Sequence, residues 1–369
     1  MSSRCRGGPV RRRGSSANFL YHIFQPLTVR LCSATPPVRP AAAKRAGAVN
    51  RYDDFRPDVP ALLKAQDAAL AAPDPGARSG DGLGPIGRLA TRVRLYALGA
   101  LVKSGAHRRL VYAGLRLGWF GQFQEYWTNQ LGNRPLQPHD FYFLSGVYRQ
   151  RLQSIDFEQL REPALASDAG HLEAWRDHRI VYHLFAHTYR DALSPLRVHR
   201  FARFVPRGGR VAEYGCGTAP MLSALARRYR HRDLQLVGAD IPHLLFHYAR
   251  WRLRDCPFVT WVAIEGGNDA PLPGLYDTIF CLEVLEHVPR PIPVLEHLHR
   301  ALRPGGHLIF DYIRSDGTGL DTVASLRDRL PALQFVLDHF EIVLGRVATD
   351  GSHVEPAVAR KREPDVTRR

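Results

Sequence analysis

The sequence of 369 residues is poor in cysteine, and its few cysteines follow no pattern. There are five, an odd number, and no two of them form a C-x-x-C pair. This excludes a disulfide framework, and because no Cys/His cluster occurs, a structural zinc site is not expected. Cys216 and Cys281 lie inside segments predicted to be buried, which favours a reducing compartment.

Long apolar runs and lysine are also scarce. No run of 18 apolar residues occurs, so a transmembrane helix is not predicted. Only four of the 51 basic residues are lysine, an arginine bias typical of a GC-rich genome. Residues 53–344 carry 35 basic and 31 acidic residues, so the central part is nearly balanced although the chain has a net charge of +16. Nucleic acid is therefore not the expected partner.

The two ends of the chain show no sustained hydrophobic period. Residues 1–52 hold ten Lys/Arg and no acid, which predicts a disordered basic segment, and residues 350–369 are predicted to form a disordered tail. The basic segment also resembles a mitochondrial transit peptide, but we favour the plainer interpretation of an overextended start or a flexible tail. We expect a cytoplasmic location, or a mitochondrial one if the segment is a targeting signal.

Residues 53–194 are predicted to form a mainly helical accessory or cap region. Residues 86–120 hold seven Lys/Arg, no acid and many apolar and aromatic residues. Such a segment is either a basic amphipathic helix that makes a peripheral contact with an anionic membrane or, as we favour, an ordinary helix pair that packs on the rest of the protein. The aromatic residues between 119 and 127 are expected in a helical core, and 171–193 is predicted to be one long helix.

The segment from Val211 to Pro220, V-A-E-Y-G-C-G-T-A-P, is typical of a strand that ends in a glycine-rich turn and opens a helix. Gly215 and Gly217 stand where the backbone must turn tightly and a ligand must approach without meeting a Cβ. Pro220 occupies the position where a dinucleotide fingerprint needs glycine, and the Gly-Lys-Ser/Thr of a P-loop is absent. The turn therefore predicts a nucleotide site of another kind.

From residue 210 the chain alternates short β-prone and helical segments. Strands are predicted at 210–214, 234–240, 258–264, 276–282 and 307–313, with helices at 218–229, 242–253, 291–302 and 320–330. This alternation predicts an α/β fold with a doubly wound, mostly parallel Rossmann-like sheet and right-handed crossovers. Residues 340–347 are predicted to be a closing strand, and no second candidate for a C-terminal strand is evident.

Four signals follow one another in this part of the chain: E-x-G-x-G-T from Glu213, an acid at Asp240, C-L-E-V-L-E-H-V-P from Cys281, and R-P-G-G at 303–306. Their order and spacing resemble the class I S-adenosylmethionine-dependent methyltransferases. The resemblance implies a methyltransferase domain over 195–349 that binds S-adenosyl-L-methionine. It also implies that the R-P-G-G segment is structural, forming the turn before the fifth strand.

The resemblance also assigns cofactor contacts to particular residues. It implies that the glycine loop holds the methionine part, that Glu213 anchors the site from the strand end, and that Asp240 accepts hydrogen bonds from the ribose hydroxyls. Asp269 is preferred over Glu265 and Asn268 for the adenine contact. The cofactor-binding residues predicted in this way are Glu213, Gly215, Cys216, Gly217, Asp240, Asp269 and Cys281.

The segment that leaves the fourth strand is the best catalytic candidate. His287 could remove a proton from the acceptor, because the ordinary pKa of histidine, ~6.5, suits proton abstraction near neutrality. The C-x-E-x-L-E-H-V-P pattern is similar to that of the ubiquinone-biosynthesis O-methyltransferases, where these carboxylates and the histidine are linked to a divalent metal and a catechol-like substrate. Glu283, Glu286 and His287 are therefore the predicted catalytic residues. By that resemblance these three residues would be the metal ligands. Two carboxylates and an imidazole suit Mg²⁺ poorly, although open octahedral sites with water exist, so a divalent metal is an alternative that we do not favour.

We expect a methyltransferase that acts on a small-molecule or lipid-linked acceptor, at oxygen, with substrate selection by the cap and residues 311–325. One alternative is an RNA or protein methyltransferase, which the balanced central charge and the lack of an Asn/Asp-Pro-Pro-Tyr/Phe motif disfavour. Two others are a cofactor-binding module without catalysis and an NAD(P)-dependent oxidoreductase, against which Pro220 argues.

Overall fold

The second half of the chain is organised around one sheet of seven strands with helices on both of its faces. The structure is a computed structural model that describes residues 119–136, 167–176, 181–191, 194–265, 268, 270–313, 321–349 and 354–363. All of these residues belong to one unit, residues 49–369. The predicted N-terminal segment 1–52 and most of segment 86–120 lie outside the described residues.

The strands follow the order β3-β2-β1-β4-β5-β7-β6 across the sheet. They are β1 (Arg210–Tyr214), β2 (Gln235–Asp240), β3 (Val259–Ala263), β4 (Tyr276–Cys281), β5 (Leu302–Tyr312), β6 (Phe340–Leu344) and β7 (Val354–Lys361). The pairs among β1 to β5 are parallel, whereas β7 is antiparallel to both of its neighbours. The predicted doubly wound, mostly parallel sheet is confirmed. Because β2 and β4 lie on opposite sides of β1, the carboxyl ends of β1 and its neighbours border the crevice where such sheets bind ligands.

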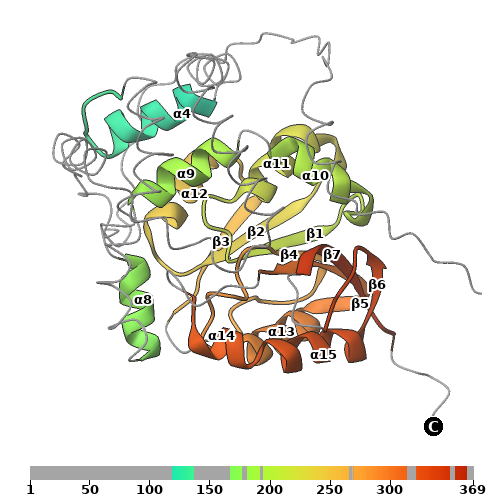
Figure 1. Cartoon of the computed structure of the whole chain (residues 1–369). Coiled ribbons are helices and arrows are strands. Elements are labelled where there is room, and N and C mark those ends of the chain that lie inside the picture. The colour runs from blue at the N-terminus through green and yellow to red at the C-terminus, as the bar shows by residue number, and fades with distance from the viewer. Residues whose placement is uncertain are drawn as a thin grey trace, which may run out of the picture. The chain divides into compact units, whose positions relative to one another are not determined.

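Helices cover the sheet in two layers (Figure 1). One layer holds α10 (Ser194–Phe201), α11 (Pro220–Arg228) and α12 (Leu244–Arg252); the other holds α13 (Pro291–Ala301), α14 (Val323–Arg327) and α15 (Arg329–His339). Side chains of β4 alternate between the layers, so Phe280 packs in the core under α11 and α12, and Ile279 in the core under α13 and α15. Each is fully buried, which stabilises the fold by about 1.5–3 kcal/mol per side chain.

All five predicted parallel strands are present, but β5 begins earlier than predicted. Pairing jumps from Tyr276↔Leu302 to Thr278↔His307, so residues 303–306 form an irregularity within the strand rather than a turn before it. The carboxylate of Asp277 holds this segment, since both of its oxygens lie within 2.8 Å of the Arg303 guanidinium and Oδ2 accepts the N–H of Arg210 at 2.7 Å. The R-P-G-G segment thus has a structural role, as expected.

The helices differ from the prediction at their ends. Helix α11 begins at Pro220 instead of 218, because Ala219 has a left-handed backbone (φ 54°) and proline suits the first helical position. In place of the one helix predicted at 320–330 there are two, because α14 ends at Arg327 and α15 runs from Arg329 to His339. Pro331 does not stop α15, since it lies in the first turn of that helix, where no backbone N–H is needed. Within the predicted helix 171–193, α8 (Asp168–Arg176) and α9 (Val181–Asp191) are helical, and 177–180 lie outside the described residues.

The prediction of a disordered tail over 350–369 is wrong for residues 354–361, which form β7. This strand lies between β5 and β6, and its residues 357–359 are completely buried. Its sequence, V-E-P-A-V-A-R-K, conceals it, because proline removes a ladder hydrogen bond and is disfavoured inside a sheet. Pro356 is tolerated here because the pairing with β5 shifts register between Phe310↔Ala357 and Tyr312↔Val354.

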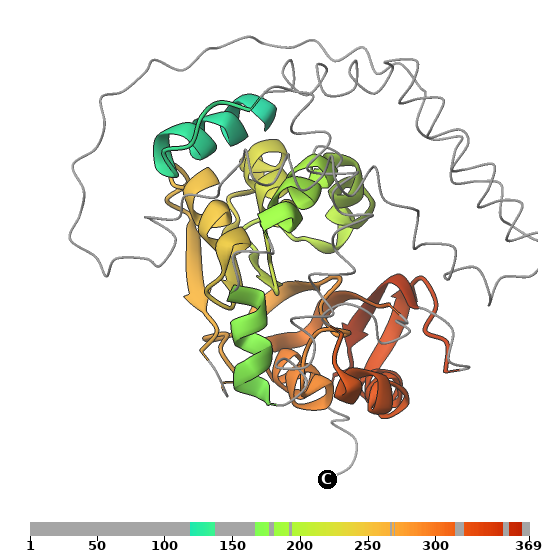
Figure 2. The same ribbon diagram turned by 60° about the vertical axis from the view of Figure 1, so that its left-hand side comes forward.

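The described part of the cap packs on α12. Helix α4 (Trp119–Glu125) and the π-helix η2 (Tyr126–Gln130) lie beside α12 (Figure 2). Their aromatic side chains contact Tyr248 and Trp251, and the Tyr126 hydroxyl lies 2.7 Å from Nδ1 of His247. Phe120, Phe123, Tyr126 and Trp127 are at most 2% exposed, which confirms their predicted place in a core. None of the helices described here combines the length and the hydropathy needed to span a bilayer.

Substituting Gly215 by alanine is expected to destabilise the fold. Gly215 has φ 63°, and a Cβ there would meet the side chain of Val284, with Cγ1 only 2.8 Å away. The strained backbone alone costs about 1–3 kcal/mol, and urea unfolding measures the loss. Gly121→Ala is the control, because nothing lies within 4 Å of its added Cβ. Alanine is also more favourable than glycine inside a helix, by about 0.5–1 kcal/mol, so this variant should not lose stability. Equal stability of the two variants would contradict the packing described for Gly215.

Candidate functional site

The glycine turn, residues 215–219, joins β1 to α11 through three residues with left-handed backbone: Gly215, Gly217 and Ala219. Ala219 is the N-cap residue of α11, and alanine has no side-chain acceptor for the first N–H groups of the helix. Glu213 replaces the missing cap. Its Oε1 accepts the N–H of Met221 at 3.1 Å and its Oε2 that of Leu222 at 2.9 Å.

Asp240 meets the same turn from the end of β2. Its Oδ2 accepts the N–H of Gly217 at 2.5 Å, and its Oδ1 accepts the N–H of Ile241 at 2.8 Å. The carboxylate is nearly buried, at 7% exposed, and Nε2 of His243 lies 3.4 Å from Oδ1. The structure therefore brings Glu213, Gly217 and Asp240 together at the carboxyl edge of the sheet, where the sequence places them.

The two glycines of the turn have different surroundings. A Cβ on Gly215 would clash with Val284, whereas a Cβ on Gly217 would meet only Leu245 at 3.7 Å, an ordinary contact. One side of the turn is thus packed and the other has room for a ligand to lie against the backbone. Arg252 fixes the turn from behind, donating from Nη1 to the carbonyl of Thr218 at 3.0 Å.

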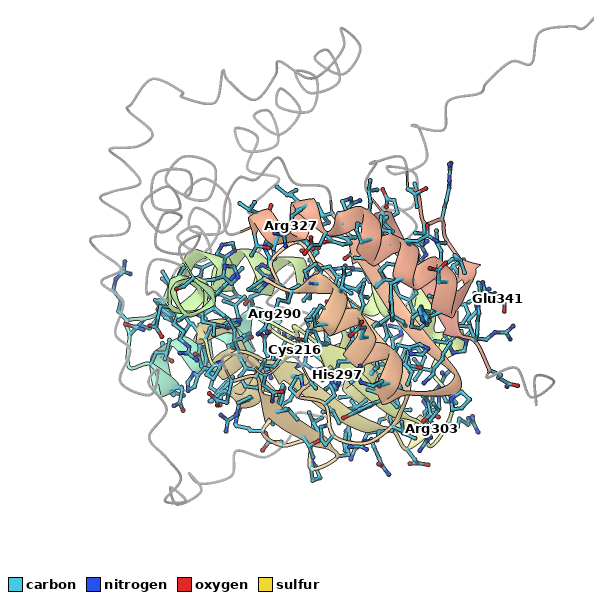
Figure 3. The ribbon with its side chains drawn as sticks, turned by 90° about the horizontal axis from the view of Figure 1, so that it is seen from below. Cys216, Arg290, His297, Arg303, Arg327 and Glu341 are labelled. Carbon is cyan, nitrogen blue, oxygen red and sulfur yellow. The ribbon has the colours of Figure 1, made fainter. Side chains whose placement is uncertain are left out.

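Neither predicted cysteine is built for thiol chemistry. Cys216 and Cys281 are 2% and 0% exposed, and Cys216 lies in the interior of the molecule while Arg303, Arg327 and Glu341 lie at its periphery (Figure 3). Burial raises the pKa of the Cys216 thiol, and the charges of Asp240 and Glu213 raise it further. Burial likewise raises the pKa of Cys281. Both are neutral thiols at pH 7, and Cys216 contributes to the turn through its backbone, donating its N–H to the carbonyl of Ala239 at 3.1 Å.

The exit loop, residues 282–288, follows β4 and starts with a strained residue. Glu283 has φ 56°, a left-handed conformation that costs a non-glycine residue about 1–3 kcal/mol. Its N–H donates to Oδ1 of Asp311 at 2.6 Å, and its carboxylate lies 3.9 Å from the Arg197 guanidinium. Asp311 begins the segment 311–325 that was expected to select the substrate, but the structure buries its side chain at 3% exposed, so it supports the loop from inside.

The end of the exit loop is tied to the residues that precede and begin α14. The carbonyl of Glu286 accepts hydrogen bonds from Ser325 Oγ at 2.7 Å and from the N–H of Thr322 at 3.1 Å. The Glu286 side chain is 3% exposed, burial raises the pKa of its carboxyl, and its Oε2 has no hydrogen-bond partner among the described residues. Glu286 therefore faces the interior.

His287 and Asp321 form a pair at this place. Nδ1 of His287 lies 2.8 Å from Oδ1 of Asp321, and the two side chains are 30% and 10% exposed. The two atoms are close enough for an ion pair, but they are not aligned as a hydrogen bond, so the carboxylate acts on the imidazole through its charge. The sequence identified His287 and missed Asp321. The only available signal was its place in the 311–325 segment already expected to meet substrate.

The predicted catalytic set does not form a metal site. Glu283 faces Arg197, the Glu286 carboxyl is buried, and His287 faces Asp321. No group of three or more His, Cys, Asp or Glu side chains in the described ranges is arranged to hold a metal ion. These residues therefore do not fit a divalent cation. Asp269, the predicted adenine contact, lies outside the described residues.

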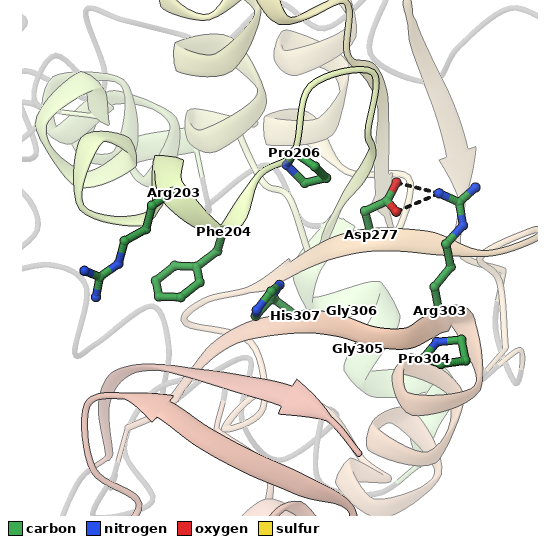
Figure 4. Close-up of a pocket in the computed structure, with 9 residues that line it drawn as sticks. All are labelled: Arg203, Phe204, Pro206, Asp277, Arg303, Pro304, Gly305, Gly306 and His307. Carbon is green, nitrogen blue, oxygen red and sulfur yellow. Dashed lines mark hydrogen bonds and ion pairs between the residues drawn. The ribbon is translucent and has the colours of Figure 1, made fainter. Parts of the chain in front are cut away.

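A cavity of about 230 Å³ lies at the other end of the sheet, where β4 and β5 begin. It is lined by Arg203, Phe204, Pro206, Asp277, Arg303, Pro304, Gly305, Gly306 and His307 (Figure 4). The ion pair of Asp277 and Arg303 forms one wall, and the Phe204 and His307 rings face each other 5.1 Å apart at their centroids. None of the predicted site residues lines this cavity, so it is not the candidate active site.

Asp311→Asn is expected to flatten the pH dependence of stability. Burial raises the pKa of Asp311 to about 7, whereas an unfolded aspartate titrates near ~3.9. Between these values the folded state binds more protons than the unfolded state, so stability falls as pH rises. At about 1.36 kcal/mol per pKa unit, the wild type should lose on the order of 4 kcal/mol relative to the variant between pH 4 and 7.

Urea unfolding at several pH values measures this difference. Asp338→Asn is the matched control, because Asp338 is exposed on α15 and only accepts from Gln334. Parallel curves for wild type and Asp311→Asn would show that Asp311 is ionised throughout.

This part of the chain is similar to known methyltransferases. Residues 185–343 match the model of a methyltransferase domain. The ubiquinone biosynthesis O-methyltransferase of Xylella fastidiosa (strain 9a5c) is 33% identical over 125 residues, which cover 33% of this chain and 49% of that protein. The protein of the same name from Pseudomonas aeruginosa (strain LESB58) is 32% identical over 124 residues, covering 33% and 52%.

Among solved structures, a putative methyltransferase from Bacillus halodurans aligns with 46% of this chain and 99% of its own, at 14% identity and a TM-score of 0.34. The chain spans about half the length of the curated relatives it matches. The family match and the ordered motifs on the sheet show that residues 185–343 form a class I S-adenosylmethionine-dependent methyltransferase domain.

Proposed function

We propose that the protein transfers a methyl group from S-adenosylmethionine to a hydroxyl oxygen of a small-molecule or lipid-linked acceptor. The observation that carries this proposal is the His287–Asp321 pair on the loop beside the glycine turn. An oxygen nucleophile must lose its proton during transfer, and a histidine beside a carboxylate is suited to accept it, because the negative charge stabilises the imidazolium that forms. The relatives named ubiquinone biosynthesis O-methyltransferases support transfer to oxygen and favour a hydroxylated ring as acceptor.

The donor site is proposed at the carboxyl ends of β1 and β2. S-adenosylmethionine supplies a methyl carbon on a positively charged sulfur. The open side of Gly217 would lie against its amino-acid part, and Asp240 would accept from the ribose hydroxyls in exchange for its present bond to Gly217. Glu213 would act indirectly, by holding α11 and the turn in place.

The transfer itself requires alignment and one proton acceptor. The oxygen–carbon bond forms as the carbon–sulfur bond breaks, and the electron pair of the broken bond stays on sulfur. The hydroxyl proton passes to the imidazole of His287, and the charge of the nearby Asp321 carboxylate stabilises the resulting imidazolium. Glu283 and Glu286 are proposed to shape the exit loop rather than to exchange protons, because one is held by Arg197 and Asp311 and the other is buried.

A lipid-linked acceptor would bring the protein to a membrane surface. Peripheral contact through residues 86–120 and a cytoplasmic location stay proposals, and most of that segment lies outside the described residues. A mitochondrial location applies if residues 1–52 target the protein there. Nucleic acid is not proposed as a partner, because residues 53–344 are nearly balanced in charge.

Asp240→Ala is expected to weaken donor binding by about tenfold or more. A hydrogen bond to a charged group contributes about 1.5–3 kcal/mol of binding free energy, and the variant loses the hydrogen bonds that Asp240 would accept from the ribose hydroxyls. Isothermal titration with S-adenosylhomocysteine measures the change. Asp255→Ala is the control, since the Asp255 side chain is 90% exposed. Undiminished binding by Asp240→Ala would place the donor elsewhere.

His287→Ala is expected to lower kcat by roughly 10²–10⁴, the range that a general base contributes. Asp321→Asn should lower it less, because the imidazole remains but the negative charge beside it is lost. Transfer of labelled methyl to 3,4-dihydroxybenzoate measures both, with S-adenosylhomocysteine affinity as a check on the donor site. His339→Ala, an exposed histidine on α15, is the control. Full activity of His287→Ala would remove His287 from the reaction.

A further inference from the structure

Trp175 of α8 joins loops from two different strands. Its ring lies 5.2 Å from that of His287 between centroids, at an interplanar angle of 74°, and 6.1 Å from that of His243, at 33°. His287 follows β4, and His243 follows β2. Figure 1 shows α8 apart from the two helical layers that cover the sheet. A side chain of the cap region therefore reaches the strand-end loops directly.

The indole is fixed in its orientation. Nε1–H donates to Nε2 of His171, one turn earlier in α8, at 3.2 Å, and the ring of His183 from α9 lies 5.9 Å away at an angle of 44°. His171 and His183 are 5% and 8% exposed, whereas Trp175 is only half-buried. A ring that is hydrogen-bonded at one edge and still partly exposed offers a rigid apolar surface, since its polar atom is already satisfied.

The two histidines that Trp175 contacts belong to different halves of the site. Nδ1 of His243 accepts the N–H of Phe246 at 3.1 Å, so its proton is on Nε2, the atom 3.4 Å from Asp240. His287 is paired with Asp321. Because β2 and β4 flank β1, the series Asp240, His243, Trp175, His287 and Asp321 crosses the end of β1, where the glycine turn lies.

We propose that Trp175 forms a wall of the acceptor site and positions a planar acceptor ring against His287. The acceptor oxygen must lie between the donor methyl and the imidazole of His287, and Trp175 is in contact with the loop of the proposed base and with the loop after β2 at once. Aromatic rings prefer offset-stacked or edge-to-face contact with one another, so an indole held here would orient a ring acceptor at little entropic cost. This inference rests on the proposed O-methyl transfer, to which it adds Trp175 as the residue that favours an acceptor with a planar ring.

The test compares wild type with Trp175→Phe and Trp175→Ala in the full chain. Isothermal titration first gives the affinity for S-adenosylhomocysteine, and 3,4-dihydroxybenzoate is then titrated into the loaded protein. Trp175→Ala should weaken the second affinity by about tenfold, near the upper end of what an aromatic contact provides, and Trp175→Phe by less than about threefold. In the methyl-transfer assay the alanine variant should raise KM for the acceptor more than it lowers kcat.

Trp251→Phe is the matched control, because Trp251 is also half-buried in an aromatic cluster but packs against Tyr126 and Tyr248, away from the exit loop. It should change neither affinity. Unchanged S-adenosylhomocysteine affinity in Trp175→Ala shows that this variant is folded. If Trp175→Ala then binds the catechol as wild type does, the wall is overturned while the proposed function stands. If wild type binds the donor analogue but no catechol, the ring acceptor itself is wrong, and the inference falls with it.

Discussion

The carboxylate of Glu213 holds the first turn of α11 against the end of β1, and the candidate donor site depends on this contact. Ala219 cannot cap the helix, so two N–H groups at its start would be buried without an acceptor if Glu213 were absent. Because the end of the helix is fixed, residues 215–219 have to connect β1 to α11 over a short distance. They do so with a left-handed backbone at every second residue, Gly215, Gly217 and Ala219. The open backbone at Gly217 is a result of that closure.

The exit loop is held in a similar way, but by residues from much later in the chain. Asp311 at the end of β5 accepts the N–H of strained Glu283, and Ser325 and Thr322 at α14 bind the carbonyl of Glu286. Asp321, in the same segment, places its carboxylate beside the imidazole of His287. The conformation of the loop that carries the proposed base therefore depends on β4, β5 and α14 together. A change in the connection between β5 and α14 would act on the reaction without touching the donor.

The fold could be predicted wherever the signal was local. The strand ending at Tyr214, the glycine turn and the acid at Asp240 each follow from a few neighbouring residues, and the structure contains all three. Prediction failed where distant contacts decide: β7 is a strand because β5 and β6 lie on both sides of it, despite Pro356. Asp321 and Trp175 were missed for the same reason, since only the folded chain brings them to His287.

The position of β7 also sets an order of assembly. Strand β6 precedes β7 in the chain but has no pairing with β5, so it can join the sheet only after residues 354–361 have been inserted between them. Until then β5 has a free edge, with unpaired backbone groups that another chain can use. Pairing that must await a late and distant segment slows folding and prolongs exposure to aggregation during synthesis. Strand β7 thus covers the exposed edge of β5 as well as completing the core.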